Sequence, residues 1–195
     1  DWSSDVCSSD LLLTGISQLI FPKQANGSLV MIDGRAIGSE LVGQDFSDAR
    51  FMKSRPSAVN YNTYTREDKE SGDYTGVGSG SKNYAPTNPE LVKRVEADIA
   101  EFLEANPSVK KEDIPTDLLT ASGSGLDPHI SPASAAVQIP ALVEATGLSQ
   151  KTLEAIVKEN TQGKFLGIFG EETVNVLKVN LEISKELGLL EQAAD

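Results

Sequence analysis

The chain has 195 residues, 39% of them hydrophobic, and a formal net charge of −12 at pH 7. These values fit one globular domain, alone or with a short anchor, and exclude wholesale disorder. The acidic balance argues against nucleic acid or an anionic membrane surface as a partner of the main body. One cysteine and one histidine cannot build a disulfide framework or a structural zinc site, so we expect no metal and no intrinsic cofactor.

Residues 1–10, DWSSDVCSSD, differ in character from everything that follows. They are mostly polar, repeat Ser-Ser-Asp, and resemble the translation of a common short-read sequencing adapter. We therefore expect this segment to be a non-native artefact and leave it out of the fold reasoning. A natural polar tail is the alternative, and the genomic DNA would decide between the two.

An apolar stretch runs from Leu11 to Phe21, and Pro22 ends it. About a dozen helical residues rise roughly 18 Å, whereas the hydrocarbon core of a bilayer is about 30 Å thick. The stretch is therefore either an amphipathic core helix or the truncated remnant, residues 11–22, of a single transmembrane helix. Residues 23–195 form the remaining domain under the second interpretation.

The next elements can be predicted from local signals. Asp33-Gly34 lies between two short apolar runs in residues 28–41 and favours the type I′ turn of a β-hairpin. Residues 61–84 are polar and glycine-rich, which indicates a surface loop. Asn88-Pro89 begins a helix that ends at Asn106-Pro107. One apolar stripe of this helix is expected to be buried: Leu91, Val92, Val95, Ile99, Phe102 and Leu103.

The last third of the chain is predicted to be mainly helical. Ser131-Pro132 opens a helix that Pro140 should kink or break and that Gly147 closes. Ser149 caps a third helix. Residues 164–170, KFLGIFG, resemble a short strand, while residues 172–187 mix the strand and helix periods, and we favour a helix there. The expected fold class is therefore mixed α/β (α+β).

Two stretches contain residue types found in binding or catalytic sites. GVGSGSKN, residues 76–83, lacks the second glycine and the final hydroxyl of a phosphate-binding loop, and no core strand precedes it. TASGSGLDPHISP, residues 120–132, contains serines, an aspartate and the only histidine, but triad members normally converge from separate elements. We expect no catalytic and no metal-binding residues in either stretch.

Residues 120–132, here called the signature loop, have a restricted shape because two glycines and two prolines limit the backbone. Restricted exposed loops are common recognition surfaces. We expect the signature loop to act by shape, as a docking or organising surface. Its candidate residues are Ser122, Gly123, Ser124, Gly125, Leu126, Asp127, Pro128, His129, Ser131 and Pro132.

Five blocks, in order, resemble the C subunit of the bacterial Kdp potassium-transporting ATPase. They are TGISQLIFPKQANGSLV, GSELVGQDFSDARFMKSRPSAVNYN, APTNPELVKRV, LLTASGSGLDPHISPASAAVQIPALVEATGLS and GKFLGIFGEETVNVLKVNLEI. The resemblance covers about Leu12 to Leu181, and the signature loop is its most specific part. Other positions in these motifs are Asn26, Gly27, Asn88, Pro89, Asn175 and Asn180.

The resemblance implies an accessory, non-catalytic subunit in the bacterial plasma membrane. A single helix would contact membrane lipid, and most of the chain would form an extracytoplasmic domain. The implied protein partners are the pore-like A subunit, the ATP-hydrolysing B subunit and the small F subunit, with no nucleic acid. The family is also described as a catalytic chaperone that raises the ATP affinity of the B subunit, so ATP would be met only through that complex.

Two other functions remain alternatives at this point. The chain could be a regulatory nucleotide-binding subunit, which labelling with a photoreactive nucleotide would reveal. It could also be an extracytoplasmic hydrolase that uses the Ser122 to His129 part of the signature loop, where Ser122, Ser124, Asp127 and His129 supply the residue types of a triad.

Overall fold

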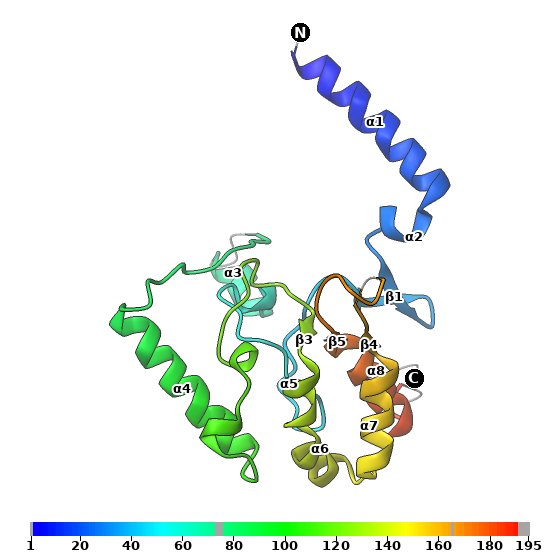
Figure 1. Cartoon of the computed structure of the whole chain (residues 1–195). Helices are drawn as coiled ribbons and strands as arrows, with labels where there is room; N and C mark the ends of the chain where they lie inside the picture. The colour runs from blue at the N-terminus through cyan, green and yellow to red at the C-terminus, as the bar shows by residue number, and fades with distance from the viewer. Residues whose placement is uncertain (1, 73–75, 165, 191–195) are drawn as a thin grey trace. The chain divides into compact units, whose positions relative to one another are not determined.

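The computed structural model describes residues 2–72, 76–164 and 166–190, with side chains in the first helix from residue 9 onward. The chain divides into two compact units, residues 1–41 and 42–195, each of which is described by itself (Figure 1). The described residues form helices and small antiparallel sheets, which confirms the expected mixed α/β (α+β) character.

The first unit consists of two helices and a hairpin. Helix α1 (Trp2–Ile20) is followed by α2 (Pro22–Ala25), and strands β1 (Leu29–Ile32) and β2 (Arg35–Ser39) pair antiparallel. Asp33 and Gly34 have φ values of +49° and +78°, the left-handed conformations that a type I′ turn requires. The predicted hairpin is therefore confirmed.

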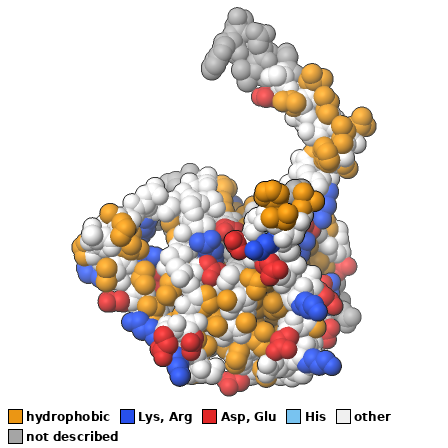
Figure 2. Space-filling model, in the orientation of Figure 1, with side chains coloured by type: hydrophobic (Ala, Val, Ile, Leu, Met, Phe, Trp, Pro, Cys, Tyr) orange, Lys and Arg blue, Asp and Glu red, His pale blue; other side chains and the backbone are white. Residues whose placement is uncertain are grey.

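The apolar part of α1 is not buried within the first unit. Leu11 and Leu19 are 73% and 85% exposed, and Figure 2 shows apolar side chains along this helix. The alternative of an amphipathic core helix is therefore not supported within this unit, because these apolar side chains are not buried there. None of the helices in the described ranges is both long and apolar enough to cross a bilayer. The helix runs through residue 10 without a break, so the divisions at residues 10 and 22 stay predictions.

The second unit is mainly helical around a small sheet. Its longer helices are α4 (Pro89–Ala105), α6 (Ile139–Thr146), α7 (Gln150–Glu159) and α8 (Val176–Glu186). Strands β3 (His129–Ile130), β4 (Thr161–Gln162) and β5 (Thr173–Asn175) form an antiparallel sheet in the order β3-β5-β4. Short elements complete the unit: η1 (Asn60–Asn62), α3 (Arg66–Ser71), η2 (Lys111–Asp113), η3 (Thr116–Leu118) and α5 (Pro132–Ala136).

The core of the second unit lies between the sheet and the C-terminal helices. Helix α7 packs against α5, α6 and α8, and both α5 and α8 contact β5. Apolar side chains from these elements exclude water together, which is the main driving force for the fold. The buried cluster consists of Met52, Ile130, Ala135, Ile139, Leu142, Leu153, Ile156, Val174, Val176, Val179 and Ile183.

Helix caps and breaks agree with the local signals. Asn88, Ser131 and Ser149 each accept a hydrogen bond from a backbone N–H in the first turn of their helix. The helix predicted from Ser131 is broken, as expected, but at Val137–Gln138, and Pro140 lies in the first turn of α6. Proline is tolerated there because the first-turn N–H groups have no partner within the helix.

Residues 172–187 contain both predicted periods. The short strand β5 leads directly into helix α8, which Asn175 caps by accepting a hydrogen bond from Lys178 N–H. The helix favoured for this stretch is confirmed for Val176–Glu186. The stretch mixes the two periodicities because its first residues form a strand and the rest form a helix.

Three expectations are wrong. In the described part of residues 164–170, residues 166–168 form a turn and Phe169 makes an isolated bridge, so the predicted strand is absent there. The polar stretch 61–84 contains helix α3, which Thr65 and Asp68 cap reciprocally; residues 73–75 of that stretch lie outside the described residues. The apolar stripe of α4 is only half-buried, and Val92 is 49% exposed, because none of the described helices or strands packs extensively against α4.

Candidate functional site

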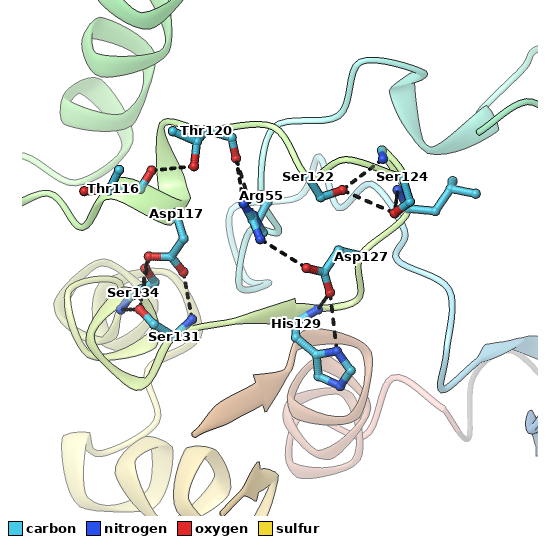
Figure 3. Close-up of polar contacts among 12 residues, drawn as sticks. Arg55, Thr116, Asp117, Thr120, Ser122, Ser124, Asp127, His129, Ser131 and Ser134 are labelled. Carbon is cyan, nitrogen blue, oxygen red and sulfur yellow. Dashed lines mark hydrogen bonds and ion pairs between the residues drawn. The ribbon is translucent and has the colours of Figure 1, made fainter. Parts of the chain in front are cut away.

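The signature loop connects η3 to β3 and the start of α5, and hydrogen bonds of its own serines shape its first turn (Figure 3). The hydroxyl of Ser122 accepts a hydrogen bond from Gly125 N–H at 2.9 Å. The hydroxyl of Ser124 accepts one from Leu126 N–H at 3.1 Å, and the two hydroxyls lie 3.4 Å apart. Both hydroxyls are therefore engaged in local turn structure.

Backbone carbonyls of the loop accept hydrogen bonds from segments far away in the sequence. A carbonyl buried without a hydrogen bond would destabilise the fold, and each of these bonds avoids that cost. The loop is thereby tied to four separate parts of the second unit. The donors and acceptors are Gly80 N–H to Ser124 O at 2.8 Å, Ser57 Oγ to Gly125 O at 2.6 Å, Gly43 N–H to Leu126 O at 2.8 Å and Val176 N–H to Pro128 O at 3.1 Å.

Two glycines allow these segments to approach one another. Gly125 has a φ of +68°, and a Cβ there would lie 2.8 Å from Gly80 O and from Val59 Cγ2. A Cβ on Gly43 would lie 2.7 Å from Asp127 O. Both distances are too short for any side chain. By contrast, nothing lies within 4 Å of the Cβ position of Gly123.

Asp127 is the polar centre of the loop. Its Oδ2 lies 3.1 Å from Arg55 Nη1, and its Oδ1 accepts a hydrogen bond from His129 N–H at 3.0 Å (Figure 3). His129 Nδ1 lies 3.4 Å from the same oxygen. The hydrogen bond with His129 is the main cause that holds the pKa of Asp127 below its usual value, and Arg55 lowers this pKa further. The carboxylate is therefore stable in its charged form.

Arg55 extends this network beyond the loop. Its guanidinium also lies 3.4 Å from Thr120 O, and its own carbonyl accepts a hydrogen bond from the Tyr61 hydroxyl at 2.6 Å. Burial raises the pKa of Tyr61 to about 12, so this phenol stays protonated and keeps donating. The side chains of Arg55 and Asp127 are 23% and 30% exposed, so water screens their attraction only in part.

A second carboxylate, that of Asp117, fixes the end of the loop. It accepts hydrogen bonds from Ser131 N–H at 2.7 Å, from the Ser131 hydroxyl at 3.1 Å and from the Ser134 hydroxyl at 2.6 Å (Figure 3). Burial alone would raise the pKa of Asp117, but the hydrogen bonds from Ser134 and Ser131 outweigh it and lower the pKa. The start of α5 is thereby held against η3.

The other motif positions have structural contacts of their own. Asn26 donates to Pro22 O at 2.7 Å, and Gly27 next to it has a φ of +80°. Asn88 caps α4, which starts at Pro89, and Asn175 caps α8. Asn180 is only 2% exposed and pairs with the backbone of Met52. Sequence reasoning missed Arg55, Asp117 and Gln138, because no local pattern links them to their partners.

The serines and the histidine of the signature loop do not assemble a hydrolytic triad. The partners of the Ser122 hydroxyl are Gly125 N–H and Ser124, while His129 pairs with Asp127. A triad needs the imidazole within hydrogen-bonding reach of the nucleophile. Among the residues that the structure describes, no group of three His, Cys, Asp or Glu side chains is arranged to hold a metal ion.

The fold and the site define a small α+β domain organised around one hydrogen-bonded loop. The family model "K+-transporting ATPase, c chain" matches residues 9–185. The chain therefore belongs to the KdpC family and is a subunit of a Kdp potassium-transporting ATPase complex. Membership of this membrane-associated complex implies the presence of other Kdp subunits.

Two relatives illustrate the similarity. The potassium-transporting ATPase KdpC subunit of Clostridium kluyveri is 80% identical over 179 residues, which cover 92% of this chain and 85% of that protein. The KdpC subunit of Clostridioides difficile is 60% identical over 185 residues, which cover 92% of this chain and 89% of that protein.

Proposed function

We propose that this chain is a non-catalytic accessory subunit that assembles and stabilises a high-affinity, ATP-driven potassium uptake complex. The observation that supports this role is the use of the signature loop. Its hydroxyls, its carbonyls and the Asp127 carboxylate all hold the domain together. A loop engaged in this way presents a fixed shape to a partner. Partners of this subunit in our proposal are the pore-like A, ATP-hydrolysing B and small F subunits.

The arrangement of this subunit at the membrane is part of the same proposal. One helix contacts lipid of the bacterial plasma membrane, and the bulk of the domain is extracytoplasmic. The exposed apolar side chains of Leu11, Leu12 and Leu13 support contact with an apolar environment.

Direct nucleotide binding is the alternative, and the structure gives it little support. The N–H groups of Gly78 and Gly80 donate to Asn62 Oδ1 and to Ser124 O, so they are not free to cradle a phosphate. A hollow of about 250 Å³ is lined by the carboxylates of Asp45, Asp98 and Glu101, which outnumber its two basic side chains, Lys53 and Arg55. These negative charges oppose a triphosphate. We therefore propose that any effect on ATP affinity acts through the B subunit.

The proposal is tested by expressing the complex with and without this chain. We expect the remaining subunits to copurify poorly and to lose potassium-stimulated ATPase activity when the chain is absent. Normal assembly and activity without it would overturn the assembly role. A photoreactive ATP analogue should label the B subunit. Labelling of this chain in the intact complex would favour the nucleotide-binding alternative instead.

A further inference from the structure

The turn between β4 and β5 exposes three large apolar side chains. Leu166, Ile168 and Phe169 are 74%, 75% and 62% exposed, and together with Gly167 they are called the apolar tip. The tip belongs to the turn that connects β4 with β5 in Figure 1. In the described part of the second unit, no other turn exposes three such side chains. Exposed apolar residues gathered in this way mark interaction sites more often than single ones do.

The backbone of the apolar tip is held in an unusual conformation. Leu166 has a φ of +54°, and Gly167 and Gly170 have φ values of +75° and +83°. Left-handed geometry is unfavourable for leucine, because its Cβ then approaches the backbone carbonyl. The turn keeps Gly167 N–H bonded to Lys164 O at 3.0 Å. The tip thus combines backbone strain with exposed apolar surface, and the folded chain buries only the smaller part of these side chains.

The charges beside the tip indicate what covers it. Glu171 and Glu172 follow it after Gly170 and are exposed, Lys164 before it is also exposed, and the whole chain carries a net charge of −12. Two adjacent carboxylates would be repelled by an anionic lipid surface. In a symmetric contact between two copies, the four carboxylates would also come close together. Both arguments favour a protein surface with basic side chains.

We propose that the apolar tip inserts into an apolar pocket, rimmed by basic side chains, on another subunit of the same complex. This inference rests on the proposed function, because it assigns a contact surface to the assembly role. Membership of a multisubunit ATPase supplies other subunits as candidate partners. The apolar side chains provide affinity, and Glu171 and Glu172 orient the contact.

The test uses the full chain coexpressed with the other subunits. Ile168→Ser and Phe169→Ser, alone and together, replace apolar side chains at the tip. Val77→Ser is the matched control, because Val77 is 78% exposed but stands alone in another loop. We expect the double variant to reduce copurification with the complex at least tenfold and Val77→Ser to leave it unchanged. The unfolding midpoint should be unaltered in all variants, since exposed side chains stabilise the fold little.

A charge-reversal variant tests the basic rim. Glu171→Lys combined with Glu172→Lys should weaken copurification and make the remaining association less sensitive to salt. A photo-crosslinking residue at position 168 should then label another subunit. Copurification of the double serine variant at the wild-type level would overturn the proposal.

Other occupants give different results. Crosslinking of position 168 to lipid, or to a second copy of the chain with loss of a dimer in the double variant, would also overturn the proposal. Failure of the wild-type chain itself to support assembly would instead refute the proposed function. The two inferences are therefore distinguished by comparing the wild-type and variant chains.

Discussion

The buried side chain of Asn180 holds the backbone of Met52 with two hydrogen bonds. Met52 N–H donates to Asn180 Oδ1 at 2.8 Å, and Asn180 Nδ2 donates to Met52 O at 2.9 Å. Gln138 binds the next residue, Lys53, in the same way, at 2.8 Å and 3.3 Å. Two amide side chains thereby satisfy the backbone N–H and C=O groups of two consecutive residues outside any helix or strand.

Asn180→Asp should destabilise the fold strongly. The aspartate cannot donate to Met52 O, and it places a carboxylate at a position that is 2% exposed. An unpaired buried acceptor together with a buried charge should lower the free energy of unfolding by about 3 kcal/mol or more. Denaturant unfolding of the full chain, followed by circular dichroism, measures the loss.

Asn62→Asp provides the matched control for that variant. Asn62 makes the same pair of hydrogen bonds with Gly78, both at 2.9 Å, but in an exposed position. Its φ of +53° suits aspartate as well as asparagine. Because water can replace the lost bond, the loss should stay below about 1 kcal/mol. Equal losses in the two variants would show that burial is not the cause.

Gly125→Val should impair folding and subunit assembly more than His129→Gln. The valine meets Gly80 O and Val59 and must adopt a left-handed backbone, at a combined cost of about 3 kcal/mol. Glutamine at position 129 retains hydrogen-bonding capacity toward Asp127. Copurification of the subunits and potassium-stimulated ATPase activity measure both effects.

Comparing Gly123→Ala with Gly125→Ala distinguishes two causes of a defect. One is the strained, crowded backbone at position 125, and the other is the mere replacement of a glycine in this loop. Position 123 has open space at its Cβ, so its variant should behave like the wild type.

If His129→Gln assembled normally yet abolished turnover while Gly125→Val was tolerated, the signature loop would have a chemical role.

Asn88→Ala should remove about 1 kcal/mol of stability by deleting the cap of α4. The Asn88 side chain accepts a hydrogen bond from Glu90 N–H at 2.9 Å, and alanine cannot replace it. Asn88→Ser keeps a capping oxygen and should recover most of the loss. Pump activity should be unchanged in both, and a specific loss of activity at normal stability would reveal a further role for this position.

Stability should fall in acid through Asp127. Because the hydrogen bond with His129 and the charge of Arg55 lower the pKa of Asp127, its contribution is present above the unfolded-state pKa. The contribution is lost as the pH falls from the unfolded-state pKa of an aspartate, about 3.9, through the lower folded-state pKa. Unfolding free energies measured between pH 3 and pH 7 should therefore depend less on pH in Asp127→Asn. An unchanged pH profile in that variant would contradict this assignment.

Local features of the fold could be predicted from the sequence, and long-range ones could not. The caps at Asn88 and Ser149 and the turn at Asp33-Gly34 depend on a few adjacent residues, so the printed letters carry the signal. The Arg55–Asp127 pair spans 72 positions and the Asn180–Met52 pair spans 128, and only the folded chain brings them together.

The turn at residues 166–169 shows a different limit. Its apolar letters predicted a strand because apolar residues usually become buried, but here they remain exposed. A pattern rule assumes that burial occurs within one chain. The rule fails where the burying surface belongs to another molecule, which is the case that we propose for this turn.

Long-range hydrogen bonds to α8, one of them from the signature loop, bear on when the second unit can fold during synthesis. Pro128 O pairs with Val176 N–H, and the Met52 backbone pairs with Asn180, so both bonds need residues of α8 that are synthesised later. Contacts between residues so distant in sequence form slowly, after local helices. We therefore expect the second unit to close only after α8 has left the ribosome. A nascent chain that stalls before α8 would be open to proteases and chaperones.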